Sequence, residues 1–257
     1  MQTTTGTFAP APGAAPLARQ VLAQARMESR LMLRNGEQLL LAVVIPVIVL
    51  VGCVEGAKRL GHHFSHPPVD VFTPGVLALA VMSTAFTSLA IATGFERRYG
   101  VIKRLGSSPL PRSGLLLGKV GALLFVEALQ IVVLCVIGLL LGWSPEPGVA
   151  PAVLAIVLGT AAFAALGLFV AGVLRAEATL AAANLIYLLL MAGGAVVLPA
   201  TSYGAWGQVA RWLPSGALGH AMRSAFLDNA VAWSSLGVLA GWAVLGTVLT
   251  ARTFKWE

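Results

Sequence analysis

Residues whose side chains could bind a partner are concentrated in one stretch of the chain, E-R-R-Y-G-V-I-K-R-L-G-S-S-P-L-P-R-S-G-L-L-L-G-K, which runs from Glu96 to Lys119. A short helix is predicted from about Glu96 to Leu105, because a helix ends ahead of a proline such as Pro109. Carboxylate and guanidinium groups on such a helix can form charge-assisted hydrogen bonds with another protein. We therefore expect a protein contact here, made by Glu96, Arg97, Arg98, Gly100, Arg104 and Pro109. Alternatively, the charges serve only to orient the chain in a membrane.

A second candidate is Glu127, which lies inside a long apolar run. On insertion scales a carboxylate near the middle of a bilayer costs about 2.5–3.5 kcal/mol before any pairing. Gln130 is three residues further on, so it can share a hydrogen bond with Glu127 on one helix face. We expect both side chains to face a helix bundle or a substrate pathway. The alternative is a structural hydrogen bond between helices.

Motifs for catalysis and metal binding are missing from the sequence. There is no G-x-x-x-x-G-K-[ST], no H-E-x-x-H and no G-x-S-x-G, so we expect no catalytic residues and no cofactor in this chain. His62, His63 and His66 could hold zinc if they shared a helix face. Pro67 and Pro68 disfavour that helix, and a solvated loop without a metal site is expected.

The elements that position these residues follow from the composition. Of 257 residues, 58% are hydrophobic and 11% charged, with a mean hydropathy of +0.86, whereas a soluble domain carries about 25% charged residues. Several apolar runs reach the roughly 20 residues that a helix needs to cross a bilayer. The prediction is an all-α polytopic membrane protein with six transmembrane helices at Gln38–Val54, Pro74–Phe95, Leu115–Leu141, Val149–Leu174, Thr179–Leu198 and Ser234–Ala251.

The segments outside the six predicted spans complete the predicted domain organisation. Residues 1–16 form a disordered tail, and residues 17–257 form one transmembrane domain. Leu17–Asn35 is predicted to be an amphipathic surface helix, because Arg26, Arg30 and Arg34 recur every four residues while Leu22, Ala25, Ser29 and Met32 lie on another face. Pro199–Trp233 is predicted to re-enter the membrane from outside or to form short surface helices there. A plain extracellular loop is the alternative.

The net charge of +7 is compatible with nucleic-acid binding, but the distribution of the basic residues is not. They lie at the ends of the apolar runs and mostly on one predicted side of the membrane. This positive-inside pattern predicts that both termini are cytoplasmic. Nucleic acid is therefore not expected as a partner.

The charged stretch also resembles the signature of ABC-2-type transporter permeases, E-R-x-x-G-x-[LI]-x-R-L-x-x-[ST]-P followed by x-G-K. It matches at Glu96, Arg97, Gly100, Ile102, Arg104, Leu105, Ser108, Pro109, Gly118 and Lys119. The closing K-R-L-x-x-x-P-L-P-R is most similar to the daunorubicin and multidrug resistance permeases. One departure is Lys103, where many relatives carry an acidic residue. The segment V-L-P-A…W-x-x-V-A-R-W-L-P resembles the re-entrant region of the same family.

The resemblance implies a function. It implies the membrane-spanning subunit of an ABC exporter in the plasma membrane, which moves a hydrophobic or amphipathic substrate out of the cell by alternating access. The implied partners are a second permease copy, membrane lipid and a separate ABC ATP-binding subunit that holds ATP and magnesium. An ATP-independent secondary transporter or channel is the alternative. Such a protein would need several charges within the membrane for ion coupling, and only Glu127 lies clearly inside a predicted span.

Overall fold

The computed structural model describes residues 15–34, 36–60, 66–101, 111–146 and 148–253. These residues form helices and no strand. The helices are α1 (Leu17–Arg34), α2 (Gly36–Leu60), α3 (Pro68–Met82), the π-helical segment η1 (Ser83–Ser88), α4 (Leu89–Arg98), α6 (Arg112–Leu140), α7 (Val149–Val173), α8 (Ala176–Gly193), the 3-10 helix η2 (Ala200–Tyr203), α9 (Trp206–Ala210), α10 (Pro214–Leu227) and α11 (Trp233–Thr253).

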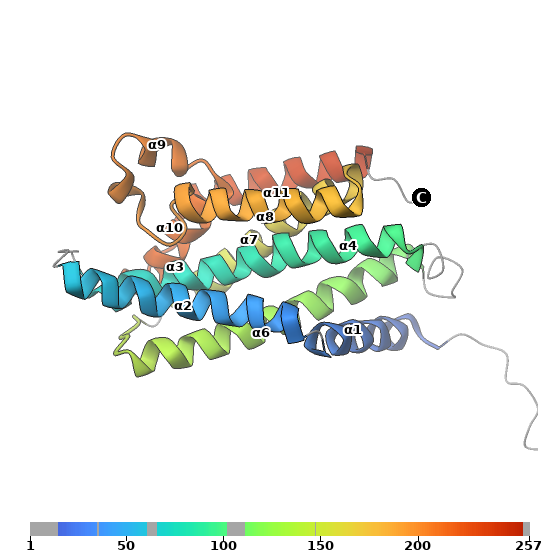
Figure 1. Ribbon diagram of the computed structural model, residues 1–257, viewed down its shortest axis with the longest axis horizontal. Coiled ribbons are helices and arrows are strands. Elements are labelled where there is room, and N and C mark those ends of the chain that lie inside the picture. The colour runs from blue at the N-terminus through green and yellow to red at the C-terminus, as the bar shows by residue number, and fades with distance from the viewer. Residues whose placement is uncertain (1–14, 35, 61–65, 102–110, 147, 254–257) are drawn as a thin grey trace, which may run out of the picture.

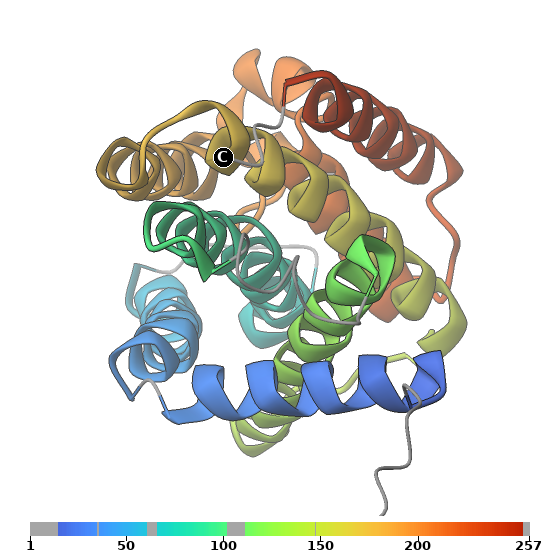
Figure 2. The same ribbon diagram turned by 90° about the vertical axis from the view of Figure 1, so that its right-hand side faces the viewer.

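The long helices run side by side as a bundle, and α1 lies crosswise at one end of it (Figures 1 and 2). The α1 end of the bundle carries α1, the last turn of α4, the start of α8 and the end of α11. The opposite end, here called the α10 end, carries the last turn of α8, the start of α11 and helices α9 and α10 (Figure 1).

Five helices among the described residues are long and apolar enough to cross a membrane: Pro68–Arg98, Leu117–Leu140, Val149–Val173, Ala176–Gly193 and Trp233–Thr253. They correspond to the last five predicted spans, and the multi-pass all-helical prediction is confirmed to that extent. The first predicted span, Gln38–Val54, falls within α2, which is not one of the five.

The predicted start of the second span, Pro74, is wrong by six residues. The helix begins at Pro68, because a proline is well suited to the first turn, where its missing N–H is not needed. Asp70 in that turn accepts a hydrogen bond of 2.9 Å from the backbone N–H of Ser144. The interval between the first two predicted spans, residues 55–73, is correspondingly shorter, since α2 also extends to Leu60.

The continuous helix α3–η1–α4 forms the centre of the bundle. Every residue of α3 from Val69 to Met82 is buried. The π-helical turn leaves the main chain of Phe86 so close to α7 that a Cβ atom added at Gly167 would lie 2.8 Å from the Phe86 carbonyl oxygen. A glycine is therefore what allows α7 to pack against this segment.

The segment between α8 and α11 begins and ends at the same end of the bundle (Figure 1). The predicted fifth span, Thr179–Leu198, is too long at its end, because the helix terminates at Gly193 and Gly194 follows as its C-cap. Ala195 then adopts a positive φ of 54°. After η2 and α9, helix α10 packs against α3 and α7, and most of its residues are buried. The alternative of a plain loop over Pro199–Trp233 is therefore wrong.

Candidate functional site

Glu96, Arg97 and Arg98 form the last turn of α4. They do not start a separate surface helix, as the sequence prediction had it, because nothing between Leu89 and Arg98 interrupts the helix that spans the bundle. The helix ends at Arg98 with Tyr99 as its C-cap. Gly100 follows with a φ of +66°, a left-handed conformation that glycine adopts without strain. Residues 102–105 of the predicted helix, Arg104 among them, lie outside the described residues, and so does Pro109.

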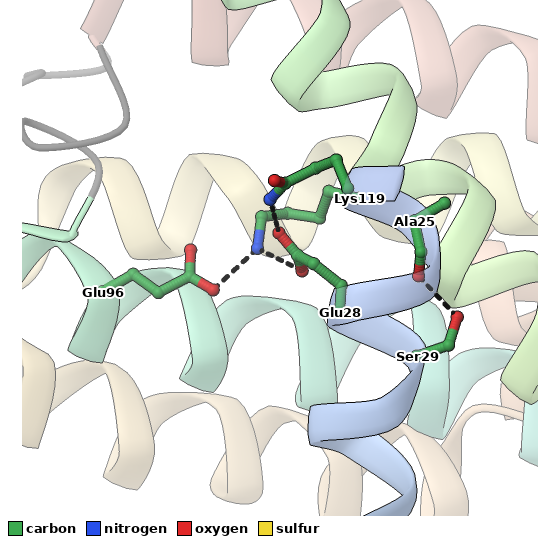
Figure 3. A network of polar contacts seen from close by, with 6 residues as sticks. Ala25, Glu28, Ser29, Glu96 and Lys119 are labelled. Carbon is green, nitrogen blue, oxygen red and sulfur yellow. Dashed lines mark hydrogen bonds and ion pairs between the residues drawn. The ribbon is translucent and has the colours of Figure 1, made fainter. Parts of the chain in front are cut away.

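Glu96 takes part in an ion network that links three helices (Figure 3). The ammonium group of Lys119 on α6 lies 2.7 Å from Glu96 Oε1 and 3.0 Å from Glu28 Oε2 on α1. The Lys119, Glu28 and Glu96 side chains are only 15%, 13% and 24% exposed. Two carboxylates therefore share one cation in a largely desolvated position, where an unpaired charge would be costly.

Close packing of α1 against α6 brings these charges together. A Cβ atom at Gly118 would lie 2.6 Å from Cγ of Gln24, and one at Gly121 would lie 3.3 Å from Cβ of Ala25. The Gln24 amide also donates a hydrogen bond of 3.0 Å to Glu28 Oε1. The inner face of α1 thus includes Ala25 and Gln24, whereas Leu22, which we predicted to be on the same face as Ala25, is 69% exposed.

Arg97 reaches the end of α7. Its guanidinium Nη1 donates to the carbonyl oxygen of Ala171 and, at 3.5 Å, to that of Leu174. The last carbonyl groups of a helix have no partner within it and carry partial negative charge. Arg97 therefore caps α7 from α4.

Arg98 reaches the start of α8. Its guanidinium forms an ion pair with Glu177, which lies in the first turn of α8. Both side chains are at least half exposed, so water screens this pair far more than it screens the Lys119 network. Close packing of Gly94 against Thr179, at 3.3 Å for an added Cβ atom, holds the same two helices together.

Three consecutive residues of α4 thus contact three different parts of the bundle. Successive side chains on a helix point about 100° apart, so a single turn can reach in three directions. Glu96 pairs with Lys119 of α6, which also holds α1. Arg97 donates to the end of α7, and Arg98 pairs with Glu177 of α8. A single turn of α4 thus connects to α1, α6, α7 and α8.

Glu127 and Gln130 lie in the interior of the bundle, each 1% exposed. Glu127 Oε1 accepts a hydrogen bond of 2.7 Å from Thr160 on α7. The Gln130 side-chain oxygen accepts one from Thr84, which belongs to the π-helical segment. The second carboxylate oxygen of Glu127 is buried without a hydrogen-bond partner among the described residues.

Arg223 is a functional candidate that sequence reasoning missed, since it lies in the predicted re-entrant or surface segment Pro199–Trp233 and was not singled out there. It lies in α10 and is 7% exposed. Its guanidinium donates to the carbonyl oxygens of Ala195 (3.0 Å), Val196 (2.9 Å) and Val197 (3.2 Å). The signal in the sequence is an arginine within an otherwise small and apolar helical stretch.

No group of three or more potential metal ligands occurs among the residues that the structure describes. His62 and His63 lie outside them. The candidate site is a set of polar links between helices, concentrated at the end of α4.

Comparison with known proteins identifies the family. No curated protein matches the chain. A family model described as ABC-2 family transporter protein matches residues 69–252, which extend from the first turn of α3 almost to the end of α11. The match covers the central helix, the α4 turn and the α10 segment. This multi-pass membrane protein therefore belongs to the ABC-2 family of transporter proteins.

Proposed function

We propose that the chain is the permease subunit of an ATP-driven exporter that moves a hydrophobic or amphipathic substrate, such as a drug or a lipid-like molecule, out of the cell. Two permease copies form the pathway in this proposal, and two separate ABC subunits supply ATP binding and hydrolysis. The family supports the transport role. The similarity to daunorubicin and multidrug resistance permeases in the stretch from Lys103 to Arg112 supports the class of substrate.

The observation that carries this proposal is the three-way contact of the α4 turn. The segment after α4, which includes Arg104 and Pro109, is proposed to bind the ATP-binding subunit. Arg97, Arg98 and Gly100 connect it to the bundle, and Glu96 continues the connection through Lys119 to α1. A partner that binds two states of the bundle unequally can shift the equilibrium between them by that difference in affinity.

The proposed orientation puts the α1 end in the cytoplasm of the cell and the α10 end outside the plasma membrane. Basic side chains gather at the α1 end, on α1, α4, α6 and the ends of α7 and α11: Arg19, Arg26, Arg30, Arg34, Arg97, Arg98, Lys119, Arg175 and Arg252. This agrees with the preference of Lys and Arg for the cytoplasmic side. In the same arrangement, α2 is a sixth span and α9–α10 re-enter from outside.

Cysteine labelling tests the orientation. After replacement of Cys53 and Cys135, a cysteine introduced at Ser65 should react with a membrane-impermeant maleimide in intact cells. A cysteine at Ser107 should react only after the membrane is permeabilised. The reverse pattern would reject the proposed orientation and, with it, the cytoplasmic coupling contact.

We assign Glu127 and Gln130 to contacts between helices, because both are buried and bound to threonines of neighbouring helices. This assignment bears on the alternative of a secondary transporter. Such a protein would use the Glu127 carboxylate to couple ion movement. Glu127→Gln keeps the acceptor for Thr160 and is expected to preserve ATP-driven transport, whereas it would abolish ion-coupled transport.

Transport in inverted membrane vesicles tests the function itself. The chain is expressed with a candidate ATP-binding subunit, and daunorubicin uptake is followed with ATP, with ADP, and with a proton uncoupler. We expect uptake that needs ATP and survives the uncoupler. Uptake that disappears with the uncoupler and is equal with ATP and with ADP would favour the secondary transporter and reject our proposal.

A further inference from the structure

A groove of about 710 Å³ lies along α11 at the α10 end of the bundle, between α11 and helices α9 and α10. It belongs neither to the α4 turn nor to the buried contacts of Glu127 and Arg223. Its lining divides into a polar mouth near the start of α11 and an apolar trough further along the same helix.

The polar mouth carries positive charge and hydrogen-bond donors. Arg211 and Gln208 lie on the α9 side, and Ser234 and Ser235 lie in the first turn of α11. Backbone N–H groups in the first turn of a helix have no acceptor within it and favour anions. His220 holds Ser235 in place, with 3.1 Å between Nδ1 and Oγ. Among the described residues, no carboxylate lines the groove.

The apolar trough is formed by a stripe of α11. Gly237, Gly241 and Leu245 are spaced four residues apart and share one helix face. A Cβ atom added at Gly237 or at Gly241 would meet nothing within 4 Å, so the surface is open there. Trp242 forms one wall, and its indole N–H donates a 2.8 Å hydrogen bond to the carbonyl oxygen of Trp212, which fixes that wall.

The length of the groove matches one leaflet of a bilayer. The eleven steps from Ser234 to Leu245 correspond to about 16 Å of helix at 1.5 Å per residue. One leaflet contributes half of a hydrocarbon core that is about 30 Å thick. A molecule with an anionic head at the mouth and a single hydrocarbon chain in the trough therefore fits both the chemistry and the length.

We propose that this groove is a binding site for an anionic glycerophospholipid of the leaflet at the α10 end. The phosphate is bound by Arg211 and the first turn of α11, and one acyl chain lies over Gly237 and Gly241. A helix from a second copy of the chain would also fit against two glycines, but it would bury Arg211 without an anion. Charge complementarity therefore favours the lipid. The inference requires that the chain spans a membrane and does not depend on ATP-driven export.

Native mass spectrometry of the purified full chain tests this site. Phosphatidylglycerol and phosphatidylcholine with identical acyl chains are titrated into the detergent-solubilised protein. We expect one phosphatidylglycerol to bind about fivefold more tightly than phosphatidylcholine, which is the contribution of one arginine near an anionic membrane surface. Arg211→Gln should remove this preference, whereas Arg59→Gln, an exposed arginine at the same end on α2, should leave it unchanged.

Filling the trough gives an independent test. Gly241→Leu and Gly237→Leu should each weaken the binding of both lipids, because the side chain occupies the space of the acyl chain. Gly52→Leu on the exposed face of α2 is the matched control and should have no effect. Unchanged binding in both trough variants would overturn the proposal. It would also be overturned if Gly241→Leu separated a dimer into monomers while phosphatidylglycerol remained bound, because the groove would then be a contact between two copies.

Discussion

The two ends of the bundle hold their buried charges in different ways. At the α1 end, Lys119 lies between Glu96 and Glu28, so three side chains from three helices satisfy one another. At the α10 end, Arg223 is satisfied by the main-chain carbonyl oxygens of three consecutive residues, Ala195 to Val197. Glycines permit close approach at both ends, and a Cβ atom at Gly75 would lie 2.6 Å from the Val197 oxygen.

This difference has a consequence for movement. Long charged side chains can keep an ion pair while their helices shift, or exchange it for another partner. A guanidinium group that binds three successive carbonyl groups fits only one local course of the main chain. We therefore expect the α1 end to rearrange during the working cycle and the α10 end to remain fixed.

The largest effect is expected at the fixed end. Arg223→Met leaves three buried carbonyl groups without their donor, and each unsatisfied group costs about 1–3 kcal/mol. We expect a loss of roughly 3–5 kcal/mol in the free energy of unfolding, measured by denaturant titration in mixed micelles. Arg223→Lys should recover only part of this loss, because an ammonium group lacks the planar fork of donors. Arg59→Met, which removes an exposed arginine, is the control, and an equal loss there would contradict the comparison.

At the α1 end, Lys119→Met should be the most damaging change. It leaves two carboxylates close together without a cation, and we expect a loss of about 2–4 kcal/mol, moderated by partial exposure. Adding Glu28→Gln and Glu96→Gln to the same chain should restore most of the stability, because the neutral amides no longer repel each other. The measurement is again unfolding in mixed micelles. A triple variant no more stable than Lys119→Met would show that the charges are not what links these helices.

A matched pair of glycines separates stability from coupling. Gly100 follows α4 with φ +66°, and Gly142 follows α6 with φ +92°. Alanine at either position should destabilise the protein by about 1–2 kcal/mol through backbone strain. Only Gly100→Ala is expected to lower the amount of substrate transported per ATP hydrolysed, in complexes with the ATP-binding subunit. Equal effects on transport from both variants would remove the special role of the α4 end.

The smallest effect is expected for the exposed ion pair. Arg98→Ala and Glu177→Ala should each change stability by no more than about 0.5 kcal/mol, because water and salt screen this contact. Thermal unfolding at low and high salt should show that even this difference disappears in high salt. A large, salt-independent loss would mean that Arg98 is as important for the α1 end as Lys119 is.

The positions of most helices could be predicted from the sequence, because a run of about 20 apolar residues has few other stable arrangements in a membrane. The last five predicted spans match observed helices, and a helix, α1, is observed over Leu17–Arg34, where the sequence predicted one at Leu17–Asn35. The ends of the helices were predicted less well: α3 begins at Pro68 where Pro74 was predicted, and α8 ends at Gly193 where Leu198 was predicted. Apolar residues continue past Gly193, so hydropathy alone gave no stop signal there.

The charged stretch around Glu96 was also recognisable from the sequence, but its partners were not. Hydropathy and spacing are properties of one segment, whereas the partner of a side chain depends on which helices become neighbours. Glu96 and Lys119 are 23 residues apart, and Glu28 is a further 68 residues from Glu96, so no local pattern joins them. Arg223 was misjudged for the same reason. Only the tertiary structure brings the turn after α8 around its guanidinium group, and this makes a residue that looked like a surface charge part of the core.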